Sequence, residues 1–234
     1  MNIRTLDFIA FSAFAIGLVA HELVAGEVER EQRQVKGFNQ VVLRGVGDLI
    51  ITQADEESLV VEAEQALLPK ISTEVKNGVL YFDFKARTIS TPYPIRFFLT
   101  VKTLSSIRSE GSGDISAAQL NLGSLALDMK GSGSANLEAL SAKQFTLKIS
   151  GSGGVKVGGG ALATQSITLN GSGDYAAELL ASDKTRVRIG GSGSAIVAAK
   201  TTLTVQISGS GKLSYYGDPQ VEQSITGAGS VEKL

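Results

Sequence analysis

The sequence is organised around a tripeptide, Gly-Ser-Gly, that returns at nearly constant spacing. Its first glycines are Gly111, Gly131, Gly151, Gly171, Gly191 and Gly209, and a variant, Gly-Ala-Gly, begins at Gly227. The first four steps between these glycines are equal, and the last two are slightly shorter. A fixed period of about 20 residues is typical of a solenoid, in which each repeat buries its apolar face only against its neighbours.

Apolar side chains keep fixed positions relative to each first glycine. Two residues before it lie Met129, Ile149, Leu169, Ile189, Ile207 and Ile225, and four before it lie Ile107, Leu127, Leu147, Ile167, Val187 and Val205. The alternation resumes four residues after it, at Ile115, Ala135, Val155, Tyr175, Ala195, Leu213 and Val231. Because side chains two residues apart share one face of a strand, these positions form an inward stack. Each repeat therefore has a strand on both sides of the glycine corner, and its remaining residues form a third face or a loop.

This pattern predicts an all-β fold: a single-stranded, right-handed parallel β-helix (β-solenoid) with coils of about 20 residues. Hydrogen bonds between strands would stack the coils about 4.8 Å apart. Outward charges support the register, since Arg108, Asp128 and Lys148 fall on adjacent coils, as do Glu110 and Lys130. Opposite charges placed this way disfavour register slips, and we interpret them as serving the stack rather than a ligand.

The N-terminal third is strand-rich but less regular, and we expect irregular N-terminal coils there. Residues 38–53 contain Gly45-Val46-Gly47 between two alternating apolar segments, which resembles a degenerate copy of the strand, corner, strand unit. Asn77-Gly78 fits a β-hairpin turn and a solenoid corner equally well, because Asn and Gly both tolerate the left-handed conformation.

Glycine suits a sharp corner because it allows a positive φ and a close approach of two backbones. We therefore interpret the tripeptides as structural corners, with serine hydroxyls able to form a ladder between coils. The corner glycines are Gly111, Gly113, Gly131, Gly133, Gly151, Gly153, Gly171, Gly173, Gly191, Gly193, Gly209 and Gly211. A phosphate-binding loop is disfavoured because no helix pattern follows the tripeptide. A calcium repeat is disfavoured because Asp114 and Asp174 would stand three coils, about 14 Å, apart.

The residue types argue against most catalytic chemistry. His21 is the only histidine and lies in a segment expected to be cleaved, and the chain has no cysteine. Histidine is the usual general base and the commonest metal ligand, so we expect no enzyme, no cofactor and no metal site. The alternative is a polysaccharide-active enzyme on a pectin-lyase-like β-helix, but the aspartates are scattered. The formal net charge of −1 gives no electrostatic reason to expect nucleic acid as a partner.

Residues 1–26 have the pattern of a signal peptide, with Arg4 near the start, an apolar run over residues 8–20 and small residues near Ala25. An uncleaved anchor is the alternative, although the run is short for a membrane span. We expect residues 27–37 to be an exposed leader and residues 38–234 to be one β-helix domain. The protein is then exported, to become periplasmic, outer-membrane-associated or secreted, and is not an integral membrane protein after cleavage.

Several motifs together resemble the bacterial head GIN domain family, whose members are described as candidate auto-transporter adhesins. The motifs are residues 45–53 after Phe38, Leu67-Leu68-Pro69-Lys70-Ile71, Asn77-Gly78-Val79-Leu80, the Gly-Ser-Gly series and Tyr215-Tyr216-Gly217-Asp218-Pro219. The likeness covers residues 35–234. It implies a secreted or envelope-located β-helical domain with an adhesive role, and it implies no catalytic residues.

The sequence therefore predicts a non-catalytic binding, adhesion or structural module of the cell envelope. The alternatives are the polysaccharide-active enzyme and an oligomerising envelope scaffold. The partner is unknown, with a glycan or a protein of the envelope or cell surface as the two candidate classes. We expect binding to concentrate at Tyr93, which lies between two prolines, and at Tyr215 and Tyr216.

Overall fold

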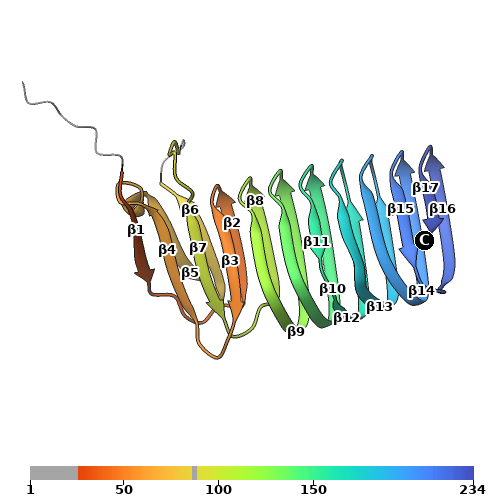
Figure 1. Ribbon diagram of the computed structural model, residues 1–234, viewed down its shortest axis with the longest axis horizontal. Coiled ribbons are helices and arrows are strands. Elements are labelled where there is room, and N and C mark those ends of the chain that lie inside the picture. Colours follow the sequence, from red (N-terminus) through yellow and green to blue (C-terminus); the bar gives the residue numbers. More distant parts are fainter. Residues whose placement is uncertain (1–25, 86–88) are drawn as a thin grey trace, which may run out of the picture.

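The computed structural model describes residues 26–85 and 89–234, which form an elongated β-solenoid (Figure 1). The predicted signal peptide lies outside the described residues, apart from Gly26. Coils follow one another along the long axis, from β1 at one end to β16 and β17 at the other. The predicted all-β solenoid is confirmed, because equivalent residues of consecutive coils pair in parallel, for example Leu120 with Leu140 and Leu140 with Gly160.

The strands of the N-terminal part are short: β1 (Val28–Arg33), β2 (Gln40–Gly45), β3 (Asp48–Gln53), β4 (Ser58–Glu64), β5 (Ile71–Lys76), β6 (Val79–Phe84) and β7 (Arg96–Val101). A short 3-10 helix, η1 (Leu68–Lys70), precedes β5. The described part of the chain contains no helix with the length and apolarity needed to cross a bilayer.

The repeat region contains the longer strands. They are β8 (Ser106–Gly111), β9 (Ile115–Gly131), β10 (Ala135–Gly151), β11 (Val155–Val157), β12 (Gly160–Leu169), β13 (Tyr175–Ile189), β14 (Ser194–Gly209), β15 (Lys212–Tyr216), β16 (Gln220–Gly227) and β17 (Ser230–Lys233).

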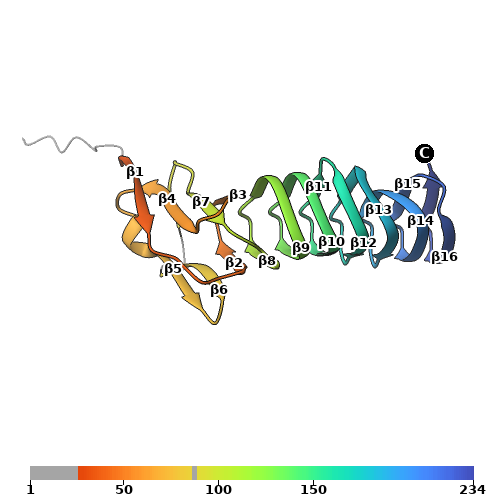
Figure 2. The same ribbon diagram turned by 90° about the horizontal axis from the view of Figure 1, so that it is seen from below.

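Each coil has one sharp corner and one gentle bend. The corners lie along one long edge of the solenoid and the bends along the opposite edge (Figure 1), so that Figure 2, seen from below, looks onto the edge with the bends. The third face or loop expected from the sequence is replaced in β9, β10 and β14 by strand that continues through the bend. The strand does not break there because the parallel pairing, for example of Leu120 with Leu140, continues around the bend.

The corners stack through backbone hydrogen bonds. The N–H of Ser132 donates to the carbonyl oxygen of Gly111 at 3.2 Å, and the N–H of Ser152 donates to that of Gly131 at 3.1 Å. Each carbonyl oxygen thereby occupies the place that a Cβ on the next first glycine would need. A positive φ cannot be the common reason for glycine at the corners, because φ is positive at Gly131 but not at Gly151. The close approach of the neighbouring backbone is common to both positions. The hydroxyl ladder suggested by the sequence does not occur among the described corner serines.

The shorter steps of the last coils are absorbed at the bend, not at the corner. Between β13 and β14, Ala177 pairs with Val197, and the two are separated in sequence by the longer corner-to-corner step. Beyond the bend, Lys184 pairs with Thr202, and these two are separated by the shorter step. The register shifts in between, where Leu179 is 70% exposed. The corner tripeptide keeps the same length in every coil, so the residues that are missing from the last coils are missing at the bend.

The irregular N-terminal coils follow the prediction in two respects. Gly45 pairs with Gly111 where β2 runs parallel to β8, so the Gly45-Val46-Gly47 segment is a true first corner. The open question at Asn77-Gly78 is resolved as a hairpin, because β5 and β6 pair antiparallel on either side of it. Both residues have positive φ, 51° and 77°, as a two-residue hairpin turn of type I′ requires.

The segment expected to be an exposed leader contains β1, whose side chains are mostly exposed. β1 pairs antiparallel with β4, and β4 pairs antiparallel with β7. Glu62 on β4 accepts hydrogen bonds from Arg30 at 2.7 Å and from Arg96 at 2.9 Å, and these hold the pKa of its carboxyl below the ordinary value. Within the described residues, the sheet therefore begins at Val28, and its first strands pair antiparallel at this end of the solenoid.

The core is a continuous stack of inward side chains, which confirms the predicted stripe from Ile107 to Ile207. Phenylalanines enlarge it near the N-terminal end, where the ring centroids of Phe82 and Phe97 are 4.7 Å apart. Ile225 lies on the predicted inward face, because it pairs in register with the buried Ile207, but it is 38% exposed. The reason is its place in β16, in the last coil of the described chain, where no further coil covers it.

Candidate binding face

The strand segments before each Gly-Ser-Gly corner form one outer face of the solenoid, here called the pre-corner face. Its outward side chains stand in rows, because strands in parallel register place equivalent residues side by side. One row is Arg108, Asp128, Lys148, Thr168, Arg188 and Gln206. Two further rows are Ala126, Thr146, Ser166, Arg186 and Thr204, and Ser124, Gln144, Thr164, Lys184 and Thr202.

Charges in the N-terminal half of this face neutralise one another. Arg108 pairs with Asp128 at 3.2 Å, and Lys130 pairs with Glu110 at 3.5 Å, as the sequence predicted. Arg44 extends the ladder to the first coil, at 3.3 Å from Glu110. Lys148 lies in register with Asp128 as predicted, but no ion pair joins these two among the described side chains. The paired charges therefore serve the stack.

The C-terminal half of the same face is different. Lys184, Arg186 and Arg188 are alternate, exposed residues of β13, here called the basic row. None of the three makes an ion pair with any described residue. Their neighbours in register are hydroxyl or amide side chains: Thr164, Ser166 and Thr168 on β12, and Thr202, Thr204 and Gln206 on β14. From β10 to β14 the three outward rows carry no acidic residue. Asp183, the exposed residue next to Lys184 at the bend of β13, is the nearest acid along the chain, and it makes no ion pair with a described residue.

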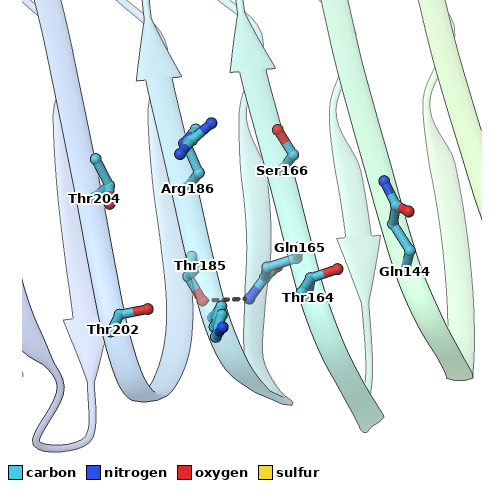
Figure 3. A pocket seen from close by; sticks show the side chains of 9 residues that line it. Gln144, Thr164, Gln165, Ser166, Thr185, Arg186, Thr202 and Thr204 are labelled. Atoms are coloured by element: carbon cyan, nitrogen blue, oxygen red, sulfur yellow. Dashed lines mark hydrogen bonds between the residues drawn. The ribbon is translucent and has the colours of Figure 1, made fainter.

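Long cations between shorter side chains leave hollows beside the basic row. One, of about 370 Å³, is lined by Gln144, Thr164, Gln165, Ser166, Lys184, Thr185, Arg186, Thr202 and Thr204. Figure 3 shows Arg186 between Ser166 and Thr204. A second, of about 330 Å³, continues along the strand past Arg188, whose Nε donates to Gln206 at 2.7 Å. The basic row thus runs beside both hollows.

A polar cluster lies in the core beneath the first hollow. Gln165 donates to the hydroxyl of Ser182 at 2.8 Å and to that of Thr185 at 3.3 Å, the bond drawn in Figure 3. The hydroxyl of Tyr175 donates to the amide oxygen of Gln165 at 3.1 Å, and burial raises the pKa of that hydroxyl far above its ordinary value. All four side chains are buried and satisfied, so this cluster fixes the packing below the face rather than offering a site.

The aspartates after the corners have a structural role. Asp114 accepts the backbone N–H of Ser134 at 2.7 Å, and Asp174 accepts that of Ser194 at 3.1 Å, so each carboxylate ties its coil to the next. They line a hollow of about 470 Å³ on the post-corner face. No group of three or more His, Cys, Asp or Glu side chains in residues 26–85 and 89–234 is arranged to hold a metal ion.

The three tyrosines that the sequence singled out do not form one surface. Tyr93 borders a hollow of about 270 Å³ beside the first corner and the start of β3, whereas Tyr215 and Tyr216 lie on β15. Six strand-to-strand steps, about 29 Å, lead from β3 to β15. Tyr215 is half-buried against the core, and Tyr216 is 42% exposed.

The basic row is a candidate functional feature that sequence reasoning missed. In the row that contains Arg108, Asp128 and Arg188, the alternating charges were interpreted as serving the stack. That interpretation holds where an acidic neighbour exists, but Arg188 lies between Thr168 and Gln206. Counting the outward positions five and seven residues before each corner would have added Arg186 and Lys184.

Comparisons with known proteins agree with this architecture. A solved "putative adhesin" from Bacteroides fragilis NCTC 9343 is 21% identical, with a TM-score of 0.84 over 89% of this chain and 97% of that one. Another from Parabacteroides distasonis ATCC 8503 is 25% identical, with a TM-score of 0.73 over 89% and 98%. A "putative lipid binding protein" from the same strain is 24% identical, with a TM-score of 0.70 over 89% and 97%.

No protein with a curated description matches the chain. A family model described as "Putative auto-transporter adhesin, head GIN domain" matches residues 37–219, which is most of the chain and includes every Gly-Ser-Gly corner. The chain therefore belongs to the head GIN domain family.

Proposed function

We propose that this protein is an exported, non-catalytic adhesion module of the cell envelope that holds its ligand on the pre-corner face. The observation that carries the proposal is the face itself, where polar side chains repeat in register over consecutive coils. Solenoids use such extended surfaces for binding. A repetitive array suits a repetitive ligand, and a glycan chain is the ligand class that best matches rows of hydroxyl, amide and cationic side chains.

Family membership supports the binding role, because the description of the family names an adhesin. The side-chain chemistry supports the absence of catalysis. Residues 22–234 contain no histidine. The carboxyl of Glu62, the buried acid of β4, has a lowered pKa because Arg30 and Arg96 donate hydrogen bonds to it, which makes it a poor general acid.

The test combines a binding screen with an activity screen on the exported protein. We expect retention on a subset of a glycan array and no product from neutral or acidic polysaccharides incubated with the protein. Hydrogen exchange with a bound glycan should protect the strands of the pre-corner face. Cleavage of a polysaccharide that one carboxylate substitution abolishes would overturn the proposal, as would protection confined to the post-corner face.

Export has its own measurement. The mass of the protein recovered from the envelope fraction or the medium should correspond to a chain that starts near Glu27, after removal of residues 1–26. Recovery of only full-length protein from the cytoplasmic fraction would contradict this part of the proposal.

A further inference from the structure

We infer that the basic row is a binding site for an extended anionic polysaccharide, one that carries carboxylate or sulfate groups. The inference rests on the proposed function and names the ligand class for the same face. Its observations are three unpaired cations on one strand, the rows of hydroxyl and amide groups beside them, and two adjoining hollows.

The contrast between the two halves of the pre-corner face is the first argument. In the N-terminal half, Arg44, Arg108 and Lys130 each lie within 3.5 Å of a carboxylate oxygen on a neighbouring strand. In the C-terminal half, the three rows supply no acidic partner between β10 and β14, and the nearest outward acid in register is Glu222 on β16, next to Thr204. Asp183, next to Lys184 at the bend, makes no ion pair with any described cation. The basic row therefore keeps its charge available for a ligand.

Spacing is the second argument. Lys184, Arg186 and Arg188 point outward at every second residue, so their Cα atoms extend over about 13 Å along β13. The flanking rows lie about 4.8 Å to either side and present hydroxyl and amide groups. A linear hydrophilic polymer that lies along β13 could form an ion pair with each of the three cations and hydrogen bonds with the hydroxyl and amide groups beside them.

The chemistry of the face also selects among polyanions. Single-stranded nucleic acids are held largely by stacking on aromatic side chains, and the pre-corner face has none from β10 to β14 outside the core. An anionic membrane requires cations that reach a flat surface, whereas here hollows lie beside them. An acidic carbohydrate has anionic groups that can pair with the basic row and hydroxyls that can form hydrogen bonds with the flanking rows. It is therefore the class of polyanion that uses both the cations and the polar side chains beside them.

The experiment compares two triple variants of the exported protein. One replaces the basic row, with Lys184→Gln, Arg186→Gln and Arg188→Gln. The matched control removes three cations from the neutralised half of the same face, with Arg44→Gln, Arg108→Gln and Lys130→Gln. Both lose the same charge, so net-charge effects on binding cancel. Dissociation constants are measured for polygalacturonate, dextran sulfate and neutral dextran over a range of salt concentrations.

We expect the wild type to bind an acidic polymer but not neutral dextran. The basic-row variant should bind about tenfold to hundredfold more weakly, with a shallower salt dependence, and the control should change less than about threefold. Comparing the dissociation constants of polygalacturonate, which carries carboxylates, and dextran sulfate, which carries sulfates, shows which anionic group the site prefers. Arg186→Gln alone, at a side chain with no partner among the described residues, should weaken binding by about fivefold if the triple variant proves unstable.

Equal weakening in the two triple variants would overturn the inference, as would equal or tighter binding to single-stranded DNA or to phosphatidylglycerol vesicles. Failure of this inference can be told apart from failure of the proposed function. If the protein binds a neutral glycan or a surface protein but no acidic polymer, the ligand class is wrong while the adhesion role stands. If the protein binds nothing on the array and no polymer, both are wrong.

Discussion

The carbonyl oxygen of Gly131 faces two groups of the next coil. It accepts the N–H of Ser152 at 3.1 Å, and it lies where a Cβ on residue 151 would be. The hydrogen bond and the missing Cβ are therefore one feature, because the bond can be this short only if the neighbouring residue is glycine. The same relation connects Gly45 with Gly111, since the carbonyl oxygen of Gly45 accepts the N–H of Ser112 at 3.0 Å and lies where a Cβ on residue 111 would be. This explains the glycine at position 111, whereas Gly45 itself has a positive φ of 89°, which favours glycine there.

We predict that Gly151→Ala lowers the free energy of unfolding by about 2–4 kcal/mol, because the new Cβ overlaps the carbonyl of Gly131 and forces the stacked corners apart. Gly123→Ala is the matched control, since a Cβ there meets nothing within 4 Å and its φ is not positive. It should change stability by less than about 1 kcal/mol. Urea denaturation measures both. Similar losses at the two positions would show that close approach is not the constraint.

A second prediction at this scale concerns the buried polar cluster. Gln165→Leu should cost about 2–4 kcal/mol, because it leaves the buried hydroxyl of Tyr175 without its partner and removes the amide donor to Ser182 and Thr185. Adding Tyr175→Phe to that variant should restore part of the loss, since it removes one unsatisfied group. The double-mutant cycle is measured by thermal and urea unfolding. Strictly additive losses would mean that the hydrogen bond does not couple the two side chains.

Among the elements, β1 depends most on electrostatics. Its side chains are mostly exposed, and Arg30 binds Glu62 of β4, which Arg96 of β7 also binds. The carboxylate of Glu62, which is 7% exposed, thus links β1 to β4 and β7, and β1 has no fully buried residue of its own. Charge-assisted hydrogen bonds of this kind are stronger than those of exposed ion pairs.

The lowered pKa of Glu62 predicts a pH dependence. The unfolded carboxyl takes up its proton near the ordinary value of 4.5, whereas the folded one resists protonation. Its stabilisation is therefore complete above about pH 4.5 and is lost as the pH falls through the lower folded pKa. Glu62→Gln should cost about 1–3 kcal/mol at pH 7 and flatten the acid limb of the stability curve. Glu64→Gln, also on β4, is the control, and an identical flattening there would contradict the assignment.

The elements also show what the sequence could predict and what it could not. The coil register was predictable because an inward side chain such as Leu147 recurs at the same distance from each corner. The hairpin at Asn77-Gly78 was not, since hairpins and corners both accept positive φ and only pairing partners separate them. The continuous bend has no residue signature, because its geometry comes from pairing between coils. The basic row was visible as residues, but its lack of acidic neighbours depends on three adjacent coils.

For the whole molecule, nearest-neighbour stacking has a direct consequence. Coils contact only the coils beside them, so stability is approximately a sum over coils and their interfaces. In register, β10 presents to β12 the same kind of surface that β9 presents to β10: apolar side chains inward, and glycines at the corner. One coil should therefore be removable, provided that the cut restores the register.

We predict that deletion of residues 131–150, one full coil, leaves a folded solenoid, because Lys130 is then followed by the intact corner at Gly151. Its circular dichroism should remain β-rich, and its urea m-value should fall by roughly a tenth, in proportion to the surface lost. Deletion of residues 131–140 is the control, since it removes a corner and leaves its neighbours without a partner in register. That variant should not unfold cooperatively. If it were as stable as the full-coil deletion, the coil would not be the unit of this fold, and the rows of the pre-corner face could not be treated as repeated positions.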